Sequence, residues 1–398
     1  MLLFTKDFTQ QEPLPEQSVQ NALAALATGR LHRYNVAKGE KGFAAEVEEA
    51  YAAYMGRKYC LACSSCGSAL YLALKCCGVT PGTPVLCNSY TLAPVPGAIE
   101  NSGAKIVLVE TAEDCTIDLA DLEAKAAASG AKILLLSHMR GHIADMGKVM
   151  DICRKHGLLL IEDCAHTMGA TWDGKKSGNF GHVGCFSTQT YKHINSGEGG
   201  LLVTDDDLVM GKAIIYSGSY MLYGMHSLRP ADEVFESVKK YTPNYSCRMD
   251  NLRAGLLLPQ IATLDKQCGR WNELYRHMEQ ELARIPGVTR IPRDPREHYV
   301  GSSIQFHLKG LSYAEMETFL AQTDKQGLSI KWFGNKEPVG FTSSYESWRY
   351  FGNLPELPKT KQLLATLCDM RLPLTFTKED CGQIAAVLHE VLAGMGKA

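Results

Sequence analysis

Short apolar runs recur between residues 58 and 204, and stretches with helical spacing separate most of them. Helical spacing marks Gly67–Cys77, Asp118–Ala128 and Lys148–His156. This alternation predicts an α/β fold in which helices cover a mostly parallel sheet of seven strands, with a ligand site beyond the carboxyl ends of the strands. The predicted strands are Lys58–Cys63, Val85–Cys87, Lys105–Val109, Lys132–Ser137, Leu158–Asp163, Cys185–Thr188 and Leu201–Thr204.

The pattern changes on both sides of this region. Before it we expect an N-terminal arm over residues 1 to about 40, with a helix near Ser18–Ala27, and then a helix at about Phe43–Met55. After it we expect an irregular stretch at Gly218–Tyr245. A long helix at about Asp250–Arg284 then leads into further strands at Ser303–Leu308 and Ile330–Trp332 and helices at Tyr313–Gln322, Thr360–Leu367 and Lys378–Ala393. At 398 residues the chain favours two domains. We place the arm and the large domain at residues 1–250, and a linking helix and small C-terminal α/β domain at 251–398.

Composition narrows the possible partners. The net charge is −2, from 41 basic and 43 acidic residues, so neither nucleic acid nor an anionic membrane is an expected partner. The apolar runs are too short to span a bilayer, and the N-terminus shows no signal-peptide pattern, which favours a cytoplasmic protein. Among fourteen cysteines, Cys60, Cys63 and Cys66 are closely spaced, but no matching ligand pair follows. We expect reduced thiols and no metal.

Two residues suggest a specific chemistry. Lys192 follows a strand-like run and precedes the turn Gly197–Gly200, and Asp163 ends an apolar strand. A lysine forms an imine with an aldehyde cofactor, and an aspartate beside the pyridine nitrogen of pyridoxal 5'-phosphate (PLP) keeps that nitrogen protonated. The competing lysines, Lys175 and Lys176, follow Asp173-Gly174, which is typical of an exposed hairpin turn. Asp163 could instead cap a helix.

These segments resemble the DegT/DnrJ/EryC1 group of PLP-dependent aminotransferases, a branch of the aspartate aminotransferase fold. The resemblance extends from about residue 13 to the C-terminus. It is densest in Glu162–His166, in Gly184–Ser187 and in Lys192–Gly200. It implies a PLP-dependent transferase fold with a large domain and a small C-terminal α/β domain.

The resemblance also implies residue roles. Lys192 matches the Schiff-base lysine that moves the proton, and Asp163 matches the partner of the pyridinium. His166 falls where the group bonds the ring hydroxyl, although a purely structural histidine is the alternative. Ser187 matches a phosphate ligand, as do Gly67 and Ser68 at a helix start, where backbone N–H groups bind phosphate. Either serine could instead be an ordinary strand or helix-start hydroxyl, and His138 could support the site or belong to the core.

Three positions depart from the group's pattern. Leu92 stands where the group has an aromatic residue stacked on the pyridine, so we expect the ring to pack either against this aliphatic side chain or against another residue. The residue that reaches the phosphate of a neighbouring subunit is either Asn244 or Ser246, depending on the alignment. The segment Tyr216–Ser219 replaces a usual Arg-Asn-His-Gly, so we expect altered substrate contacts there.

The resemblance implies a homodimeric aminotransferase that carries an amino group from L-glutamate or L-glutamine to a keto-sugar or keto-cyclitol. A transaminase of simple amines, diamines and aldehydes is an alternative. A sugar dehydratase of the same fold would carry histidine in place of the lysine, and His193 directly follows Lys192. A non-catalytic regulator and a PLP lyase acting on cysteine are further alternatives.

Overall fold

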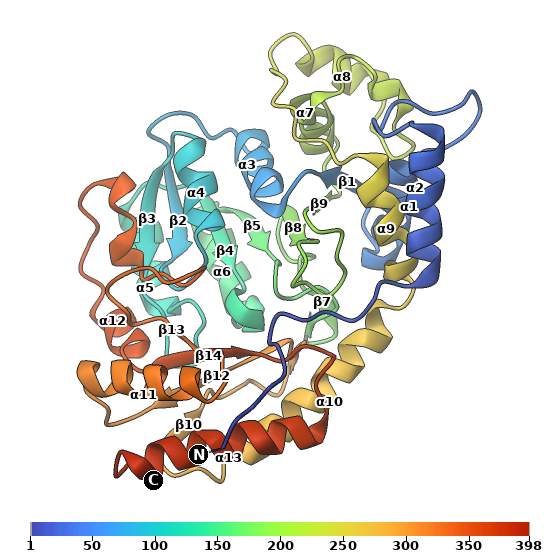
Figure 1. Cartoon of the computed structure of the whole chain (residues 1–398). Coiled ribbons are helices and arrows are strands. Elements are labelled where there is room, and N and C mark those ends of the chain that lie inside the picture. The colour runs from blue at the N-terminus through green and yellow to red at the C-terminus, as the bar shows by residue number, and fades with distance from the viewer. Residues whose placement is uncertain (1, 398) are drawn as a thin grey trace.

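A seven-stranded sheet forms the centre of the computed structural model, which describes residues 2–397 (Figure 1). The strand order is β1-β9-β8-β5-β4-β2-β3. Neighbours from β3 to β8 are parallel, and β9 is antiparallel to both β8 and β1. The predicted sheet is therefore confirmed. Its strands are β1 Tyr59–Cys63, β2 Pro84–Asn88, β3 Lys105–Val109, β4 Ile133–Ser137, β5 Leu159–Asp163, β8 Val183–Ser187 and β9 Gly200–Thr204.

Helices bury both faces of this sheet. Alternate residues of a strand point to opposite faces, so Leu134 and Leu136 of β4 join one buried cluster while Ile133 and Leu135 join another. The first cluster includes residues of α2, α5, α6 and α9, and the second includes residues of α3, α4 and α7. These helices are α2 Phe43–Met55, α3 Cys66–Cys76, α4 Pro94–Asn101, α5 Leu119–Ala128, α6 Met146–His156, α7 Asp207–Gly218 and α9 Asn251–Ile261.

Between the large sheet and the C-terminal region, two predicted segments differ from the structure. The single helix expected at Asp250–Arg284 is wrong: α9 ends at Ile261 and α10 occupies Leu264–Leu282. Pro259 lies in the last turn of α9, where it removes a backbone donor and disfavours continuation. The stretch expected to be irregular contains α8, Asp232–Val238.

The C-terminal region forms a second, antiparallel sheet with the order β10-β12-β14-β13. Its strands are β10 Val288–Arg290, β12 Ser303–Leu308, β13 Lys331–Trp332 and β14 Leu367–Arg371, and α11 Tyr313–Lys325 and α13 Lys378–Gly394 lie against it with α10 (Figure 1). β14 was not predicted, because the expected helix at Thr360–Leu367 runs into it. That helix, α12, occupies Pro358–Leu364.

The N-terminal segment packs with this second sheet. Phe4 and Phe8 contact Phe376 within the same buried cluster, and the segment that contains them runs beside α13 (Figure 1). The first helix, α1 Glu16–Thr28, instead packs against α9 of the large region. The domain boundary at residue 250 stays a prediction.

The cysteines and the longest apolar segments also bear on the sequence analysis. All fourteen cysteines are free thiols, and all except Cys77 and Cys247 are buried. Among residues 2–397, no helix combines the length and apolarity needed to cross a membrane.

Candidate active site

The register of the central sheet brings the predicted site residues to one edge. Ser137, at the end of β4, lies opposite Asp163, at the end of β5. Ser187, at the end of β8, lies opposite Gly200, whose other partner is Cys63 at the end of β1. Since α3 begins just after β1, strand ends and a helix start meet at this edge.

Lys192 and His166 form a contact pair at this edge. Lys192 is half-buried in the turn after β8, and its Nζ lies 2.8 Å from Nε2 of the buried His166. Burial and the nearby charge of Arg140 lower the pKa of Lys192 to about 7. Burial and the charge of Lys192 hold the pKa of His166 well below its usual value. The site therefore offers a neutral imidazole beside an amine that can be neutral near pH 7.

Asp163 is held by a chain of hydrogen bonds. Its Oδ2 accepts from Oγ of Ser137 at 2.7 Å, and that oxygen in turn accepts from Oγ1 of Thr91 at 2.8 Å. Its Oδ1 accepts from the N–H of Ala165 at 3.1 Å. The carboxylate is buried, so these donors fix its direction and stabilise its charge. Sequence analysis missed Ser137 and Thr91 as site residues, although each lies at or just after a predicted strand end.

The start of α3 forms a cradle of donors. Oγ of Ser65 caps the helix by accepting from the N–H of Ser68 at 2.9 Å, and Oγ of Ser68 lies 3.0 Å from Oγ of Ser64. Among the described residues, the N–H groups of Cys66 and Gly67 have no hydrogen-bond partner. A side chain at Gly67 would meet only ordinary contacts, the nearest at 3.7 Å, so packing within the chain does not require glycine there. Free N–H groups and open space at a helix start fit the phosphate of PLP.

Comparison with known proteins identifies the chain's relatives. Residues 19–389 match the DegT/DnrJ/EryC1/StrS aminotransferase family. The chain belongs to this family. The predicted family and enzyme class are thereby confirmed.

The relatives of this family member differ in the share of the chain over which they align. GDP-perosamine synthase of Caulobacter vibrioides is 34% identical over 246 residues, which is 61% of this chain and 62% of that protein. Spore coat polysaccharide biosynthesis protein SpsC of Bacillus subtilis is 29% identical over 389 residues, 95% of each chain. L-glutamine:scyllo-inosose aminotransferase of Streptomyces griseus is 29% identical over 69% of this chain and 64% of that enzyme.

Solved structures show the same fold. 3-Amino-5-hydroxybenzoic acid synthase superposes with a TM-score of 0.82 at 22% identity, covering 97% of this chain and 99% of that one. GDP-4-keto-6-deoxy-D-mannose-3-dehydratase of E. coli superposes with a TM-score of 0.81 at 16% identity, covering 98% and 100%. The predicted transferase fold is confirmed. Because aminotransferases and a dehydratase share it, the fold alone does not separate those activities.

In this DegT-family chain, the side chain of His193 is directed away from the pair of Lys192 and His166. Its Nε2 lies 3.1 Å from Oγ of Ser302, and its ring packs 5.1 Å from that of Trp271. Lys192, and not His193, therefore makes the contact with His166 at the strand ends.

The competing lysines lie in the predicted hairpin. Strands β6 (Thr171–Trp172) and β7 (Lys175–Lys176) pair on either side of Asp173-Gly174, both with positive φ, and β11 (Glu297–His298) extends them into a small sheet. Lys176 bonds the backbone oxygen of Tyr54, and Lys175 is exposed.

The segment Asn244–Arg248 lies beside the α3 cradle of its own chain. The N–H of Ser64 donates to the backbone oxygen of Cys247 at 2.8 Å. Oδ1 of Asn244 accepts a hydrogen bond from the N–H of Ser246 at 2.8 Å, and Ser246 is exposed to solvent. Contact of Asn244 or Ser246 with a neighbouring subunit stays a prediction.

Leu92 is half-buried and packs against an apolar cluster that includes Tyr90, Met139 and Phe333. Its position next to Thr91, which bonds Ser137, places it close in sequence to the network that holds Asp163. Its predicted contact with the pyridine ring stays a prediction.

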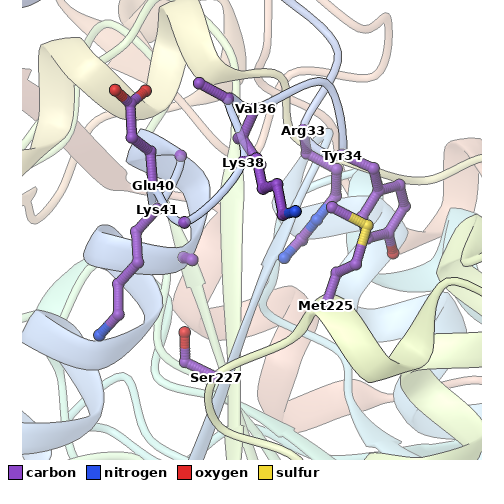
Figure 2. A pocket seen from close by; sticks show the side chains of 12 residues that line it. Arg33, Tyr34, Val36, Lys38, Glu40, Lys41, Met225 and Ser227 are labelled. Carbon is purple, nitrogen blue, oxygen red and sulfur yellow. The ribbon is translucent and has the colours of Figure 1, made fainter.

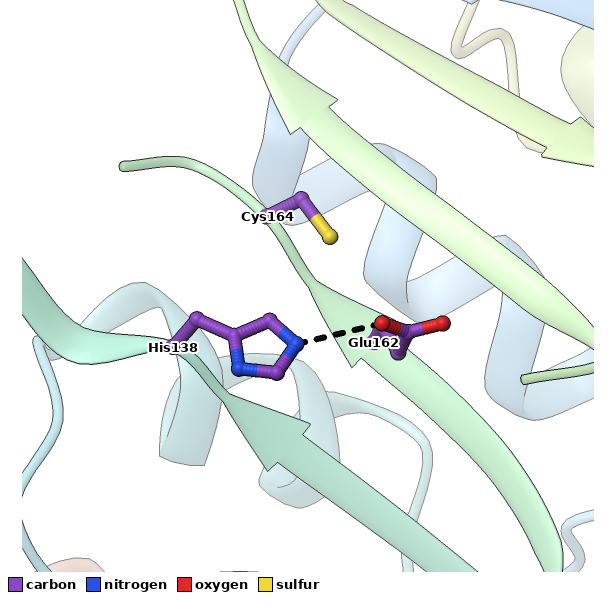
Figure 3. Close-up of side chains that lie close together, drawn as sticks. All are labelled: His138, Glu162 and Cys164. Atoms are coloured by element: carbon purple, nitrogen blue, oxygen red, sulfur yellow. Dashed lines mark hydrogen bonds and ion pairs between the residues drawn. The ribbon is translucent and has the colours of Figure 1, made fainter. Parts of the chain in front are cut away.

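Behind the site, His138, Glu162 and Cys164 have ligand atoms within 4.8 Å of one another (Figure 3). Glu162 accepts hydrogen bonds from three backbone N–H groups of residues 178–181 and lies 3.1 Å from Nε2 of His138. Because protein donors satisfy this carboxylate, it can be buried without a metal or ligand. Its role is structural: it fixes the loop at residues 178–181.

A separate cavity of about 310 Å³ lies between the loop after α1 and residues 225–227. Figure 2 shows the side chains of Arg33, Tyr34 and Met225 along one side of it. None of the residues predicted to hold the cofactor lines it.

Proposed function

We propose that this chain, as a cytoplasmic homodimer, binds PLP through Lys192 and moves an amino group from L-glutamate or L-glutamine to a keto-sugar or keto-cyclitol. The observation that carries the proposal is the contact of Lys192 with His166, at a strand edge where Asp163 is locked by Ser137. The acceptor class is supported by the names of the relatives, which include a perosamine synthase and a scyllo-inosose aminotransferase.

When bound, PLP supplies a protonated pyridine ring that accepts electrons. Asp163 keeps the ring nitrogen protonated, because a fixed carboxylate stabilises the positive charge beside it. Ser187, Ser68 and the free N–H groups of α3 hold the phosphate.

Lys192 is the proton carrier. With a pKa of about 7 its amine would be available in neutral form to take the proton from the α-carbon of the donor and to hold it for delivery to the cofactor. His166, whose Nε2 lies 2.8 Å from Nζ, would hold the amine in place and would bond the ring hydroxyl. An acceptor ketone then receives the amino group in the reverse order of steps.

The homodimer is part of the proposal. Asn244 and Ser246 lie on an exposed loop beside the α3 cradle, where a second copy could bring the same loop to the phosphate.

The test follows the visible absorption of the PLP-loaded protein. We expect L-glutamate or L-glutamine to remove the band of the lysine-bound cofactor with release of the 2-oxo acid, and a keto-sugar or scyllo-inosose to restore it. A band that no donor changes, with water lost from a deoxysugar substrate, would support the dehydratase instead. The absence of any band would favour a non-catalytic regulator.

A further inference from the structure

One face of the small sheet is polar. Asp369 of β14 lies opposite Lys331 of β13 and Gln305 of β12, and Arg371 follows two residues along β14. Cross-strand partners and residues two apart share a face, so these four side chains lie together. The alternate residues form the apolar core on the other face: Ile304, Phe306, Trp332, Cys368 and Met370.

This polar face contacts the large domain next to Lys192. Asp369 Oδ2 lies 2.9 Å from a terminal guanidinium nitrogen of Arg140, which follows β4. The guanidinium of Arg371 stacks 3.6 Å from the ring centre of Tyr191, the residue directly before Lys192. Two arginines from different domains thus border the reactive amine.

The backbone of Arg140 is held in an unusual conformation. Its φ of 54° lies in the left-handed region, which residues other than glycine rarely adopt. The next residue, Gly141, packs so closely that an added Cβ would lie 3.3 Å from the backbone oxygen of His166. Such strain costs about 1–3 kcal/mol and persists where surrounding contacts enforce it. Arg140 is thereby fixed beside the catalytic pair.

The charges of this group do not balance. Two cations, Arg140 and Lys331, are ion-paired to one fully buried carboxylate, Asp369, and the charge of a third, Arg371, also acts on it. Nζ of Lys331 is 3.5 Å from that carboxylate, and within residues 2–397 neither this nitrogen nor Nε of Arg140 has a hydrogen-bond partner. The side chain of Arg140 is only 6% exposed. Buried cationic donors that lack a hydrogen-bond acceptor are costly even beside an ion pair, so this arrangement favours an anion that accepts from them.

Other nearby groups do not supply this anion. Gln305 donates to Asp369 at 2.8 Å and also contacts His142. Burial holds the pKa of His142 well below its usual value, so its imidazole is neutral. Burial, together with Arg140 and Arg371, lowers the pKa of Lys331 to about 8 despite the attraction of Asp369.

We propose that Arg140, Lys331 and Arg371 form a subsite that binds a carboxylate of the substrate next to Lys192. Guanidinium groups bind carboxylates through two parallel hydrogen bonds, and the ammonium group of Lys331 adds a third donor. The proposal rests on the proposed function, since it assigns the substrate chemistry of the same site. The carboxylate belongs either to the amino donor or to the carbonyl acceptor.

The test measures binding of succinate to the PLP-loaded protein by calorimetry, with uncharged succinamide as the matched ligand. Succinate carries no amine or ketone, so its binding does not depend on turnover. We expect Arg371→Gln and Lys331→Gln each to weaken succinate binding about tenfold or more, since each removes a charge-assisted contact. Asp369→Asn removes the competing negative charge and should tighten binding, an effect that general damage to the fold would not produce. Arg154→Gln, on the exposed side of α6, is the control and should change nothing.

Equal succinate affinity in all these variants would overturn the proposal. So would variants that weaken GDP binding but not succinate binding, because the subsite would then serve a nucleotide diphosphate. Measuring the two half-reactions separately shows whose carboxylate the subsite binds. If it binds the carboxylate of the amino donor, Arg371→Gln slows the step with L-glutamate. If it binds the carboxylate of the acceptor, Arg371→Gln slows only the return step with a carboxylated ketone. We expect every variant to retain the visible band of bound PLP. A parent protein that shows no such band would mark failure of the proposed function and not of the subsite.

Discussion

Nζ of Lys192 lies 2.8 Å from Nε2 of His166, although 26 positions separate these residues in the chain. The contact exists because β5 and β8 are adjacent and parallel, so that the segments following both strands leave the sheet at one edge. Burial of this pair determines the protonation state of the amine, and that state can be measured.

The reactivity of Lys192 should depend on pH with a midpoint near 7. The pKa is lowered from the ordinary lysine value of about 10.4, so the amine is neutral and reactive above pH 7 and protonated below it. The rate at which PLP attaches to the cofactor-free protein, followed by its visible band, should rise through pH 7 and level off by about pH 8.5. A midpoint near 10 would contradict the burial of this amine.

Ser137→Ala should weaken PLP binding by about tenfold. The hydroxyl donates to Oδ2 of Asp163, and an unpaired buried carboxylate oxygen costs about 1–3 kcal/mol, where 1.4 kcal/mol is tenfold. A spectral titration of the cofactor measures the change. Ser237→Ala, at an exposed position of α8, is the matched control and should leave the affinity unaltered. Equal affinities for both variants would remove Ser137 from the site.

Gly200→Ala should disturb the α3 cradle. An added Cβ would lie 2.5 Å from the backbone N of Cys66 and 2.5 Å from the backbone of Ser65, so either β9 or the helix start must move. We expect a loss of about 1–3 kcal/mol in the free energy of unfolding together with weaker PLP binding.

The control for this substitution is Gly269→Ala in α10, where an added Cβ meets nothing within 4 Å. It should stabilise the protein by about 0.5–1 kcal/mol, because alanine is the better helix former. Urea denaturation measures both variants, and a neutral Gly200→Ala would show that the cradle tolerates displacement.

A second prediction about stability concerns Arg33 and Glu48, a fully buried ion pair at 2.8 Å whose carboxylate also accepts from the N–H of Ala62. Glu48→Gln leaves the arginine unpaired and should cost about 3–5 kcal/mol of unfolding free energy. Burial raises the pKa of Glu48, but the charge of Arg33 outweighs this effect and the pKa falls to about 2. The stabilisation by this pair is therefore complete above about pH 4.5 and is lost as pH falls toward 2. Acid denaturation of the parent protein and of the variant should converge below that range.

Sequence analysis predicted the central sheet well because buried parallel strands are continuous apolar runs, as in Ile133–Leu136. It could also select Asp163 and Lys192 as candidates, since each belongs to a local motif next to a strand end; their roles stay predictions. It missed β14, because Asp369 and Arg371 interrupt the apolar pattern there; these polar residues face the active site instead of the core. It missed the network from Thr91 through Ser137 because those contacts join distant segments that only the sheet register brings together.

The most direct measurement of the central claim is the site of covalent attachment. The PLP-loaded protein is reduced with sodium borohydride, digested and analysed by mass spectrometry. The account predicts a single pyridoxyl group on Lys192 and none on Lys175 or Lys176. A label on another lysine, or no label at all while the protein remains folded, would contradict it.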